Sequence, residues 1–178
     1  MPIQIQSGKC KTGKKITIYD DYAEVDLGHE VVSIIDVEDV QLVSDYAWYK
    51  SHYGYSCNKN NKRGTNIMMH RLIMRASEGE YVDHINRNPL DNRKSNLRIC
   101  SHQQNCFNKC GNKNTTSKHR GVCWKTREQK WIGEIKCGDT KKYIGSYLSE
   151  DDAGRAYDKE AIALYGKFAY LNFPMEVK

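Results

Sequence analysis

A short window of this chain concentrates side chains that can bind a metal ion and move a proton. Asp83 and His84 are adjacent, Asn96 follows in a polar segment, and Asn105 completes a window of 23 residues. An imidazole that is neutral near pH 7 can take a proton from water. A carboxylate and amide oxygens suit a hard divalent cation such as Mg²⁺, which stabilises charge on a reacting phosphate. These residue types therefore predict metal-assisted hydrolysis of a phosphodiester bond.

The backbone around the window must bring these groups to one phosphate. On a strand, Asp83 and His84 point to opposite faces, so they converge only if the strand bends or a helix closes over its end. Residues 86–95 are rich in turn formers and predict a loop. Residues 101–104 form a capping box, which predicts a helix that carries Asn105 on its second turn.

The N-terminal part is expected to be rich in β-structure. Residues 15–25 and 30–35 are β-branched runs on either side of a turn at 26–29, which predicts a hairpin. Residues 36–49 have apolar side chains at helical spacing, and residues 66–74 are apolar enough for a short buried helix or strand. Four aromatic residues are expected in the core or on strands, without a chemical role: Trp48, Tyr49, Tyr53 and Tyr55.

The C-terminal part has a different composition. Residues 107–117 are polar and are typical of a linker. Three short runs of apolar and aromatic residues then predict three strands, at 120–124, 130–136 and 142–148. Ser149 and the three acidic residues after it favour the start of a helix, and Gly166 is placed to end that helix. The pattern predicts a three-stranded sheet packed on one helix.

The formal charge of +6 is distributed unevenly: the net charge is −4 over residues 1–50, +7 over 51–114 and +3 over 115–178. The candidate site lies in the most basic segment, which is typical of a surface that meets a polyanion, although basic loops also serve solubility. No run is long enough for a membrane span and the first residues lack the apolar core of a signal peptide, so we expect a soluble, intracellular protein. Seven cysteines without a CxxC pair indicate free thiols rather than a disulfide framework or a zinc site.

The run DHINRNPLDNRKSNLRICSHQQN, residues 83–105, resembles the HNH endonucleases of the ββα-metal (His-Me finger) superfamily, within it the homing endonucleases of phages and introns. With shorter motifs upstream, the resemblance covers about residues 30–110. It implies that His84 is the general base, that Asn96 holds this base in position, and that Asp83 is a metal ligand. Asn105 takes the last motif position, where other members have His, and would complete the metal site.

The asparagine at position 105 bears on the metal and on the product. An amide oxygen favours a hard metal, Mg²⁺ with Mn²⁺ as a substitute, over zinc or nickel. Some members of the family with Asn at this position cut only one strand, so the sequence leaves open a nick or a double-strand break. Four basic residues are candidates for phosphate contacts, with structural roles equally open: His70, Arg71, Arg93 and Arg98.

Residues 118–174 resemble the AP2/ERF DNA-binding domain, which also occurs at the C-terminus of HNH homing endonucleases. The motifs are Arg120-Gly121-Val122, KWIGEI at 130–135, YIGSY at 143–147, Ala156-Tyr157-Asp158 and LNFP at 171–174. The resemblance implies a three-stranded antiparallel sheet that lies in the major groove of DNA. Cys123 and Tyr143 stand where plant members often have Arg and Trp, so the base preference of those relatives is not transferred. The groove-facing candidates are Arg120, Lys125, Arg127, Lys136, Lys141 and Tyr143.

Together these observations predict an α+β protein in two parts. A ββα-metal HNH nuclease region would span 1–110, with a β-rich part at 1–55 and its core at about 66–110; a linker at 111–117 would join it to an AP2-like module at 118–178. The expected activity is site-specific hydrolysis of double-stranded DNA in a bacterial or phage-infected cell, by a chain that could act as a monomer. The alternatives are an idle sequence-specific DNA-binding regulator, an RNA-directed or structural binding module, and a zinc-stapled scaffold.

Overall fold

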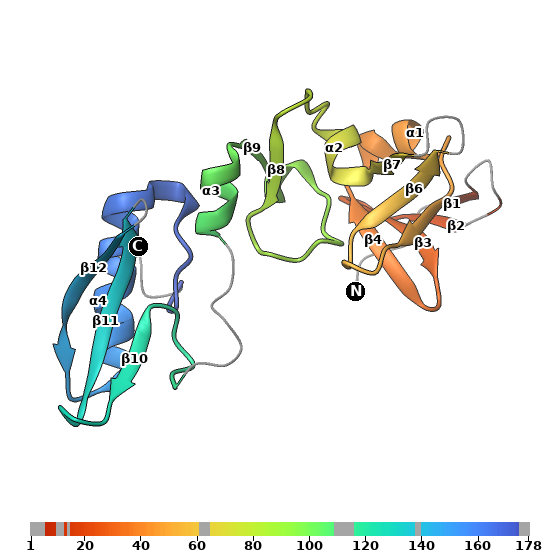
Figure 1. The fold of residues 1–178 in the computed structure, drawn as a ribbon. Helices are drawn as coiled ribbons and strands as arrows, with labels where there is room; N and C mark the ends of the chain where they lie inside the picture. The colour runs from red at the N-terminus through yellow and green to blue at the C-terminus, as the bar shows by residue number, and fades with distance from the viewer. Residues whose placement is uncertain are drawn as a thin grey trace. The chain divides into compact units, whose positions relative to one another are not determined.

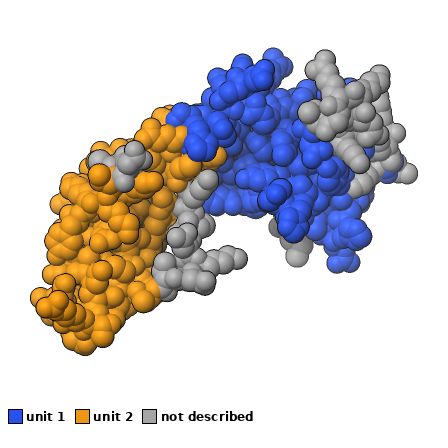
Figure 2. Space-filling model, viewed as in Figure 1, with its two compact units in different colours: residues 1–102 blue, residues 103–178 orange. Residues whose placement is uncertain are grey.

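The computed structural model describes residues 6–9, 13, 15–60, 65–108, 116–137 and 140–174. The chain divides into two compact units, residues 1–102 and residues 103–178, which Figure 2 colours separately. The first unit combines short helices with small antiparallel sheets, and the second unit has one antiparallel sheet and a helix of 16 residues (Figure 1).

Within the described ranges, none of the helices has the length and apolar character needed to cross a lipid bilayer.

The first unit begins with a four-stranded antiparallel sheet whose strands lie in chain order. Its strands are β1 (Gln6–Lys9), β2 (Lys15–Ile18), β3 (Ala23–Gly28) and β4 (Val31–Ile35). In β3, alternate residues are buried, so Ala23, Val25 and Leu27 form one face of the hydrophobic core. The predicted hairpin is confirmed as β3 and β4, but the turn predicted at 26–29 is wrong: residues 26–28 belong to β3, which pairs with β4, and the turn lies at His29 and Glu30.

The prediction of one continuous run over residues 15–25 is wrong, because the chain turns between Tyr19 and Tyr22. The amide of Tyr19 donates to the carbonyl of Tyr22 at 2.9 Å, and the two rings stack with their centroids 4.6 Å apart. Asp20 and Asp21 between them are turn residues, and they divide the run into β2 and β3.

A second small sheet packs beside the first. After the short helices η1 (Val37–Asp39) and α1 (Val40–Val43), strands β5 (Trp48–Lys50), β6 (Ser56–Asn60) and β7 (Thr65–Met68) form an antiparallel sheet that leads into α2 (Met69–Ile73). Trp48 is buried, and its indole donates to the carbonyl of Val43 at 2.8 Å. Tyr53 was expected in the core or a strand, but it is 82% exposed in the tight turn between β5 and β6.

The helical spacing predicted for residues 36–49 is confirmed for residues 37–43, after which the chain becomes a strand. The segment 66–74 was predicted to be a short helix or a strand, and it contains both: most of β7 and all of α2. Buried Met69 and Ile73 of α2 join Val43 and Trp48 in one core cluster. This core supports the candidate site on one side.

The candidate site lies on a third, two-stranded sheet. Strand β8 (Tyr81–His84) pairs antiparallel with β9 (Leu97–Cys100), and the short helix η2 (Lys94–Asn96) precedes β9. The loop predicted between Asn86 and Ser95 is confirmed, and it returns to β4 through a parallel bridge between Ile34 and Asp91. Helix α3 (His102–Phe107) follows, as the capping box predicts.

The second unit contains the three predicted strands and the predicted helix. β10 (Val122–Lys125), β11 (Lys130–Cys137) and β12 (Thr140–Tyr147) form an antiparallel sheet, and α4 (Glu150–Tyr165) packs on it before the short helix η3 (Gly166–Phe168). The hydroxyl of Ser149 accepts from the amide of Asp152, and Gly166 ends α4 with a φ of 53°. Both helix ends therefore agree with the sequence.

Helix α3 is grouped with the second unit, although the sequence assigned it to the nuclease region. The ring of Phe107 stacks on Tyr165 with centroids 4.0 Å apart, and the Arg120 guanidinium donates to the carbonyl of Phe107 at 2.7 Å. Of the predicted linker, residues 111–115 lie outside the described residues. The functional division into 1–110, 111–117 and 118–178 stays a prediction.

Replacement of Gly121 by Ala is expected to destabilise the second unit strongly. At a φ of +75°, a Cβ would lie 2.1 Å from Cδ2 of Tyr157 and 2.7 Å from the carbonyl oxygen of Glu134. The backbone strain and the overlap together should cost about 3 kcal/mol of unfolding free energy. Urea denaturation measures this loss, with hydrogen exchange of the α4 amides reporting the second unit.

Gly166→Ala is the matched control, because Gly166 also has a positive φ, of 53°, but no described atom lies within 4 Å of the position that its Cβ would take. It should lose only about 1 kcal/mol. Equal losses in the two variants would contradict a steric role for Tyr157.

Candidate functional site

Asp83 and His84 are the last two residues of β8, and each is only 6% exposed. Because neighbouring strand residues point to opposite faces, the two side chains meet different partners. Asp83 forms an ion pair with Arg98, its cross-strand partner on β9, with the Arg98 Nε 2.8 Å from Asp83 Oδ2. His84 faces Asn92, and its ring lies near His70 and Tyr55.

The surroundings of His84 favour its neutral form. Burial lowers the pKa of His84 below its usual value, although the hydrogen bond to Asn92 and the charges of Asp83 and Asp91 oppose this effect. A neutral imidazole is the form that can accept a proton from water. The structure therefore gives this residue the protonation state that a general base needs at neutral pH.

His70, on α2, packs its ring against His84 at a centroid distance of 5.1 Å and an interplanar angle of 73°. Burial, together with the nearby His84 and Arg71, lowers the pKa of His70 to about 3. Its Nδ1 is buried and has no hydrogen-bond partner among the described residues. His70 is therefore a neutral wall of the pocket around His84, beside the ring of Tyr55 at 5.3 Å.

Asn96 holds the loop that follows His84 and does so through the backbone. Its Oδ1 accepts from the amide of Asn86 at 2.9 Å, and its Nδ2 donates to the carbonyl of Asp91 at 2.8 Å. Its own carbonyl accepts from the amide of Ile85 at 2.8 Å. These bonds join the start and the centre of the loop to Asn96, and the contact with the His84 ring itself comes from Asn92.

Asp91 ties the loop together from the inside. Both of its oxygens accept from Arg93, each at 2.8 Å, and Oδ2 also accepts from Nδ2 of Asn86 at 2.9 Å. These bonds, of which that from Arg93 has the largest effect, lower the pKa of Asp91. Asp91 is therefore a charged structural residue in the centre of the loop.

The chemistry of the donors decides which metal ion the site could hold. The carboxylate of Asp83 and the amide of Asn105 offer hard oxygen ligands, which suit Mg²⁺ better than zinc. Among the described residues, no group of three or more His, Cys, Asp or Glu side chains is arranged to hold a metal ion. Asn105, on α3, belongs to the second unit, so its role as a metal ligand together with Asp83 stays a prediction.

Of the four candidate phosphate contacts, the three arginines have hydrogen-bond partners inside the protein and His70 packs against other rings. Arg71 donates to the carbonyls of Ala76 and Ser77 and makes a short contact with that of Glu80, so it supports the turn before β8. Arg93 pairs with Asp91, Arg98 pairs with Asp83, and His70 is buried beside His84. Their structural roles are visible, and their contact with phosphate stays a prediction.

The second unit carries a row of exposed basic residues on its sheet. Lys136 lies across from Lys141 in the register of β11 and β12, and Glu134 lies across from Tyr143, which is 59% exposed. Lys125 on β10 and Arg127 in the next turn are also exposed. Five of the six groove-facing candidates therefore lie on the strands and turn of this sheet.

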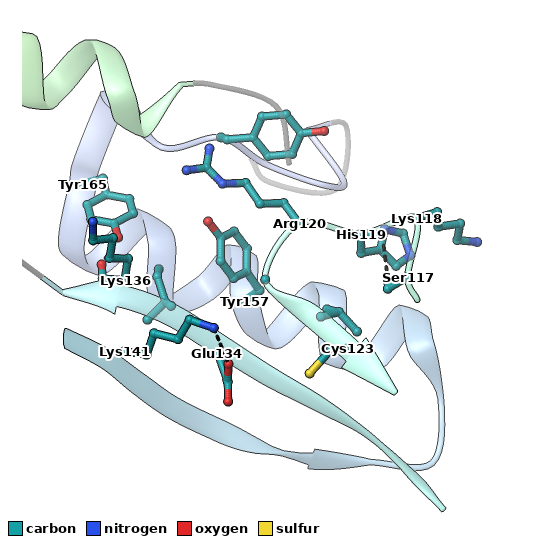
Figure 3. Close-up of a pocket in the computed structure, with 14 residues that line it drawn as sticks. Ser117, Lys118, His119, Arg120, Cys123, Glu134, Lys136, Lys141, Tyr157 and Tyr165 are labelled. Atoms are coloured by element: carbon teal, nitrogen blue, oxygen red, sulfur yellow. Dashed lines mark hydrogen bonds and ion pairs between the residues drawn. The ribbon is translucent and has the colours of Figure 1, made fainter. Parts of the chain in front are cut away.

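Arg120, the sixth candidate, lies just before β10 at a cavity of about 520 Å³. Lys136, Lys141 and Glu134 line the same cavity, and Figure 3 shows the Lys141 amine pointing at the Glu134 carboxylate, 3.3 Å away. The Arg120 guanidinium lies over the ring of Tyr170, 5.4 Å from its centroid. The positive groups of the sheet edge thus converge on a concave surface.

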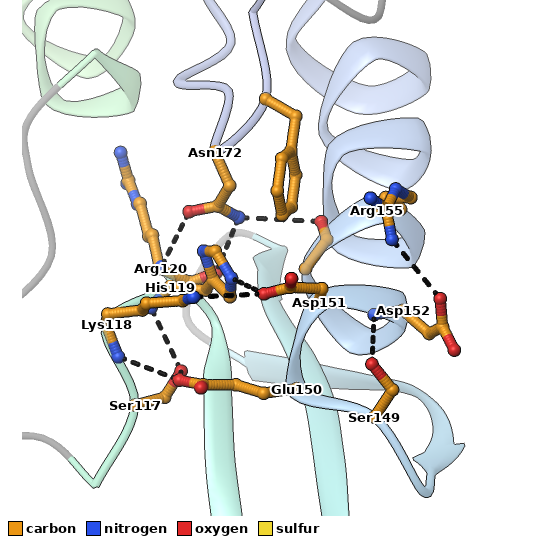
Figure 4. A network of polar contacts seen from close by, with 12 residues as sticks. Ser117, Lys118, His119, Arg120, Ser149, Glu150, Asp151, Asp152, Arg155 and Asn172 are labelled. Carbon is orange, nitrogen blue, oxygen red and sulfur yellow. Dashed lines mark hydrogen bonds and ion pairs between the residues drawn. The ribbon is translucent and has the colours of Figure 1, made fainter.

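A polar network fixes the segment that carries Arg120 (Figure 4). The amide of Arg120 donates to Oδ1 of Asn172 at 2.8 Å, and Nδ2 of Asn172 donates to Oδ1 of Asp158 at 3.0 Å. His119 contacts Asp151 at 2.7 Å, and the hydroxyl of Ser117 donates to Glu150, also at 2.7 Å. The segment before β10 is therefore anchored to the first turn of α4.

Comparison with known proteins gives the chain its family. A model of the HNH endonuclease family matches residues 67–106, which contain β8, the loop and β9. An uncharacterized HNH endonuclease of Acanthamoeba polyphaga mimivirus is 32% identical over 151 residues, which cover 82% of this chain and 76% of the viral protein. The chain belongs to the HNH endonuclease family.

Two other similarities of this HNH protein are partial. Dehydration-responsive element-binding protein 2E of Oryza sativa subsp. japonica is 38% identical over 68 residues, 37% of this chain and 21% of the plant protein. Protein 3.8 of Escherichia phage T7 is 34% identical over 58 residues, 33% of this chain and 48% of the phage protein. The chain thus spans less than half the length of either relative.

Sequence reasoning missed three residues of the site. The side chain of Asn92 contacts both Ser33 and the ring of His84. The third residue, Asp91, holds the loop by its bonds to Arg93. In the sequence, Asn92 and Asp91 are turn formers like their neighbours, and Ser33 is one polar residue inside an apolar strand. That single buried hydroxyl in β4 was the one signal that pointed to a polar partner inside the core.

Asp91→Asn is expected to weaken the first unit in a pH-dependent way. Folding lowers the pKa of Asp91. Its contribution to stability is therefore fully present above the ordinary carboxyl pKa of about 4, and it is lost as the pH falls from there through the lower pKa of the folded state. At neutral pH the variant should lose about 2 kcal/mol of unfolding free energy. Below pH 4 the difference from the wild type should shrink.

Urea denaturation at several pH values measures both effects. Asp20→Asn, on the exposed turn between β2 and β3, is the matched control and should leave the stability unchanged. A stability difference between Asp91→Asn and the wild type that is constant from neutral to acid pH would contradict the role of the Asp91 charge.

Proposed function

We propose that this HNH protein is a site-specific endonuclease that hydrolyses phosphodiester bonds of double-stranded DNA with the help of Mg²⁺. The observation that carries the proposal is a neutral, buried imidazole, His84, adjacent to the Asp83 carboxylate on β8 of an HNH chain. One group is ready to take a proton and the other offers a hard ligand. We further propose that β8, β9 and α3 form the ββα-metal arrangement.

In this proposal each residue has one task. His84 accepts a proton from a water molecule, which then attacks the phosphorus atom. Asn96 keeps the loop after His84 closed, and Arg98 orients the Asp83 carboxylate by its ion pair. Asp83 and Asn105 would hold the cation. When bound, a divalent cation supplies charge neutralisation at the phosphate and at the leaving oxygen.

The second unit would provide DNA recognition as an AP2-like module. Its three-stranded sheet packed on α4 and its exposed Lys and Arg residues support this role, because a β-ribbon with basic side chains fits the major groove. The partial similarity to a plant element-binding protein points the same way. Linking a reader to a cutter raises the effective concentration of the cutter at the target.

Two finer parts of the proposal follow from the resemblance: the division into 1–110, 111–117 and 118–178, and the homing type. An intracellular, cytoplasmic location is proposed because the reaction acts on DNA. Cleavage of one strand, a nick, is proposed on the asparagine at position 105. A catalytically idle DNA-binding regulator is the second candidate, and the ion pair that Arg98 makes with Asp83 favours it, since a guanidinium already occupies this carboxylate.

His84→Ala should lower the cleavage rate by about 10³-fold, since general bases contribute factors of this order. Asp83→Ala should abolish Mg²⁺-dependent cleavage, and chelation by EDTA should do the same to the wild type, with recovery on addition of Mg²⁺ or Mn²⁺. The assay follows nicking and linearisation of a plasmid that carries DNA from the chain's own genomic surroundings.

His52→Ala is the control, because His52 is an exposed histidine outside the site. It should cleave at the wild-type rate. Binding without cleavage by the wild type in either metal would favour the idle regulator, and full activity of Asp83→Ala would contradict the metal assignment.

Lys136→Ala together with Lys141→Ala should weaken DNA binding. If each lysine neutralises one phosphate, the slope of log K against log salt should fall by about 2. Titration of labelled duplex DNA at several salt concentrations measures both quantities on the full chain.

Lys142→Ala is the matched control, since Lys142 is the neighbour of Lys141 in β12 and its side chain points to the opposite face of the sheet, where it forms an ion pair with Glu160 of α4. It should change the slope little. An equal decrease in the control and in the double variant would contradict DNA recognition by this face of the sheet.

A further inference from the structure

Asn92 connects the candidate base to two strands of the N-terminal half. Its side chain is fully buried, at 0% exposure. Its Oδ1 lies 3.2 Å from Nε2 of His84, and its Nδ2 lies 2.7 Å from Oγ of Ser33 in β4 and 3.5 Å from Oγ of Ser56 in β6. One carboxamide thus has a ring nitrogen on one side and two hydroxyls on the other.

The two sides of Asn92 determine which way its amide points. The amino group carries two N–H donors and the carbonyl oxygen carries none. Ser33 and Ser56 offer two acceptors on the same side, whereas His84 offers one ring nitrogen on the other. In the reverse orientation two buried N–H groups would share one ring nitrogen, and leaving such a donor unsatisfied costs about 1–3 kcal/mol.

The Ser33 hydroxyl supports the same orientation. It has a single proton, and the carbonyl oxygen of Leu90 lies 3.0 Å from it as an acceptor, with the thioether of Met69 at 3.3 Å. A hydroxyl that donates to Leu90 presents its lone pairs to Asn92, which must then be the donor. The proton order therefore runs from Ser33 to Leu90, from Asn92 to Ser33 and from His84 to Asn92.

We infer that Asn92 is a positioning residue that fixes neutral His84 as the tautomer with its proton on Nε2. This inference rests on the proposed function, in which His84 is the general base. Nδ1 then carries the lone pair that accepts the proton: an O–H bond of water breaks, an Nδ1–H bond forms, and hydroxide and an imidazolium result. The imidazolium keeps its Nε2–H bond to Oδ1 of Asn92.

Nitrogen NMR tests the tautomer without any cleavage assay. The full chain is labelled with ¹⁵N in its histidines, and two-bond ¹H–¹⁵N correlations are recorded at a pH near 8, where an ordinary imidazole is neutral. His84→Gln assigns the signals by their loss. We expect a protonated-type shift at Nε2 and an unprotonated-type shift at Nδ1; the reverse pattern, or averaged shifts, would overturn the inference.

Three variants show whether Asn92 causes this preference. Asn92→Leu removes the acceptor and should give a mixture of both tautomers, with a cleavage rate lowered by about 10²-fold and unchanged DNA affinity. Asn92→Asp keeps an acceptor and should keep the Nε2–H tautomer, which decides the matter if Asn92→Leu does not fold. Asn66→Leu, at an exposed site in β7, is the matched control and should change nothing. An unaltered tautomer in folded Asn92→Leu would overturn the inference.

The two kinds of measurement separate this inference from the proposed function. A wild-type chain with the expected tautomer that leaves DNA intact would count against the nuclease and would leave the role of Asn92 in place. Cleavage by a wild-type chain whose His84 carries its proton on Nδ1 would support the nuclease and would contradict the role of Asn92.

Discussion

The site depends on the return of the loop after β8 to the edge of β4. Ile34 donates its amide to Leu90 at 2.8 Å and accepts from the amide of Asn92 at 2.7 Å, so a single residue of β4 holds the loop by two backbone bonds. A loop rich in Asn and Asp has many hydrogen-bonded alternatives of its own. The sheet edge selects one of them, and in that conformation the side chain of Asn92 points at His84.

Burial then has opposite consequences for the charge of two adjacent residues, Asp83 and His84. A buried carboxylate needs a partner charge, because an unpaired buried ion costs several kcal/mol, and Asp83 has Arg98 across the strand pair. A buried imidazole can stay neutral at much lower cost if its polar atoms are hydrogen-bonded. The alternation of β8 therefore separates a charged carboxylate from a neutral imidazole although the two residues share a peptide bond.

How much the sequence predicts depends on how local each interaction is. The cap at Ser149, the end of α4 at Gly166 and the three strands of the second unit all follow from residues next to one another. The link from Ser33 to Asn92 spans 59 positions, so no local pattern contains it. Tyr53 was predicted to be in the core or a strand from its residue type, but a turn of the chain leaves this aromatic residue exposed.

The partners of the arginines bear on where DNA affinity arises. Arg71, Arg93 and Arg98 donate to carbonyls and carboxylates of the first unit, where they hold the turn before β8, the loop and Asp83. A guanidinium engaged in this way must give up a charge-assisted bond before it can bind a phosphate in the same geometry. The exposed lysines Lys141 and Lys142 of β12 instead form ion pairs within the second unit, with Glu134 and Glu160. Removing Lys141 should therefore change binding without changing the geometry at His84, whereas the arginines of the first unit cannot be altered without disturbing it.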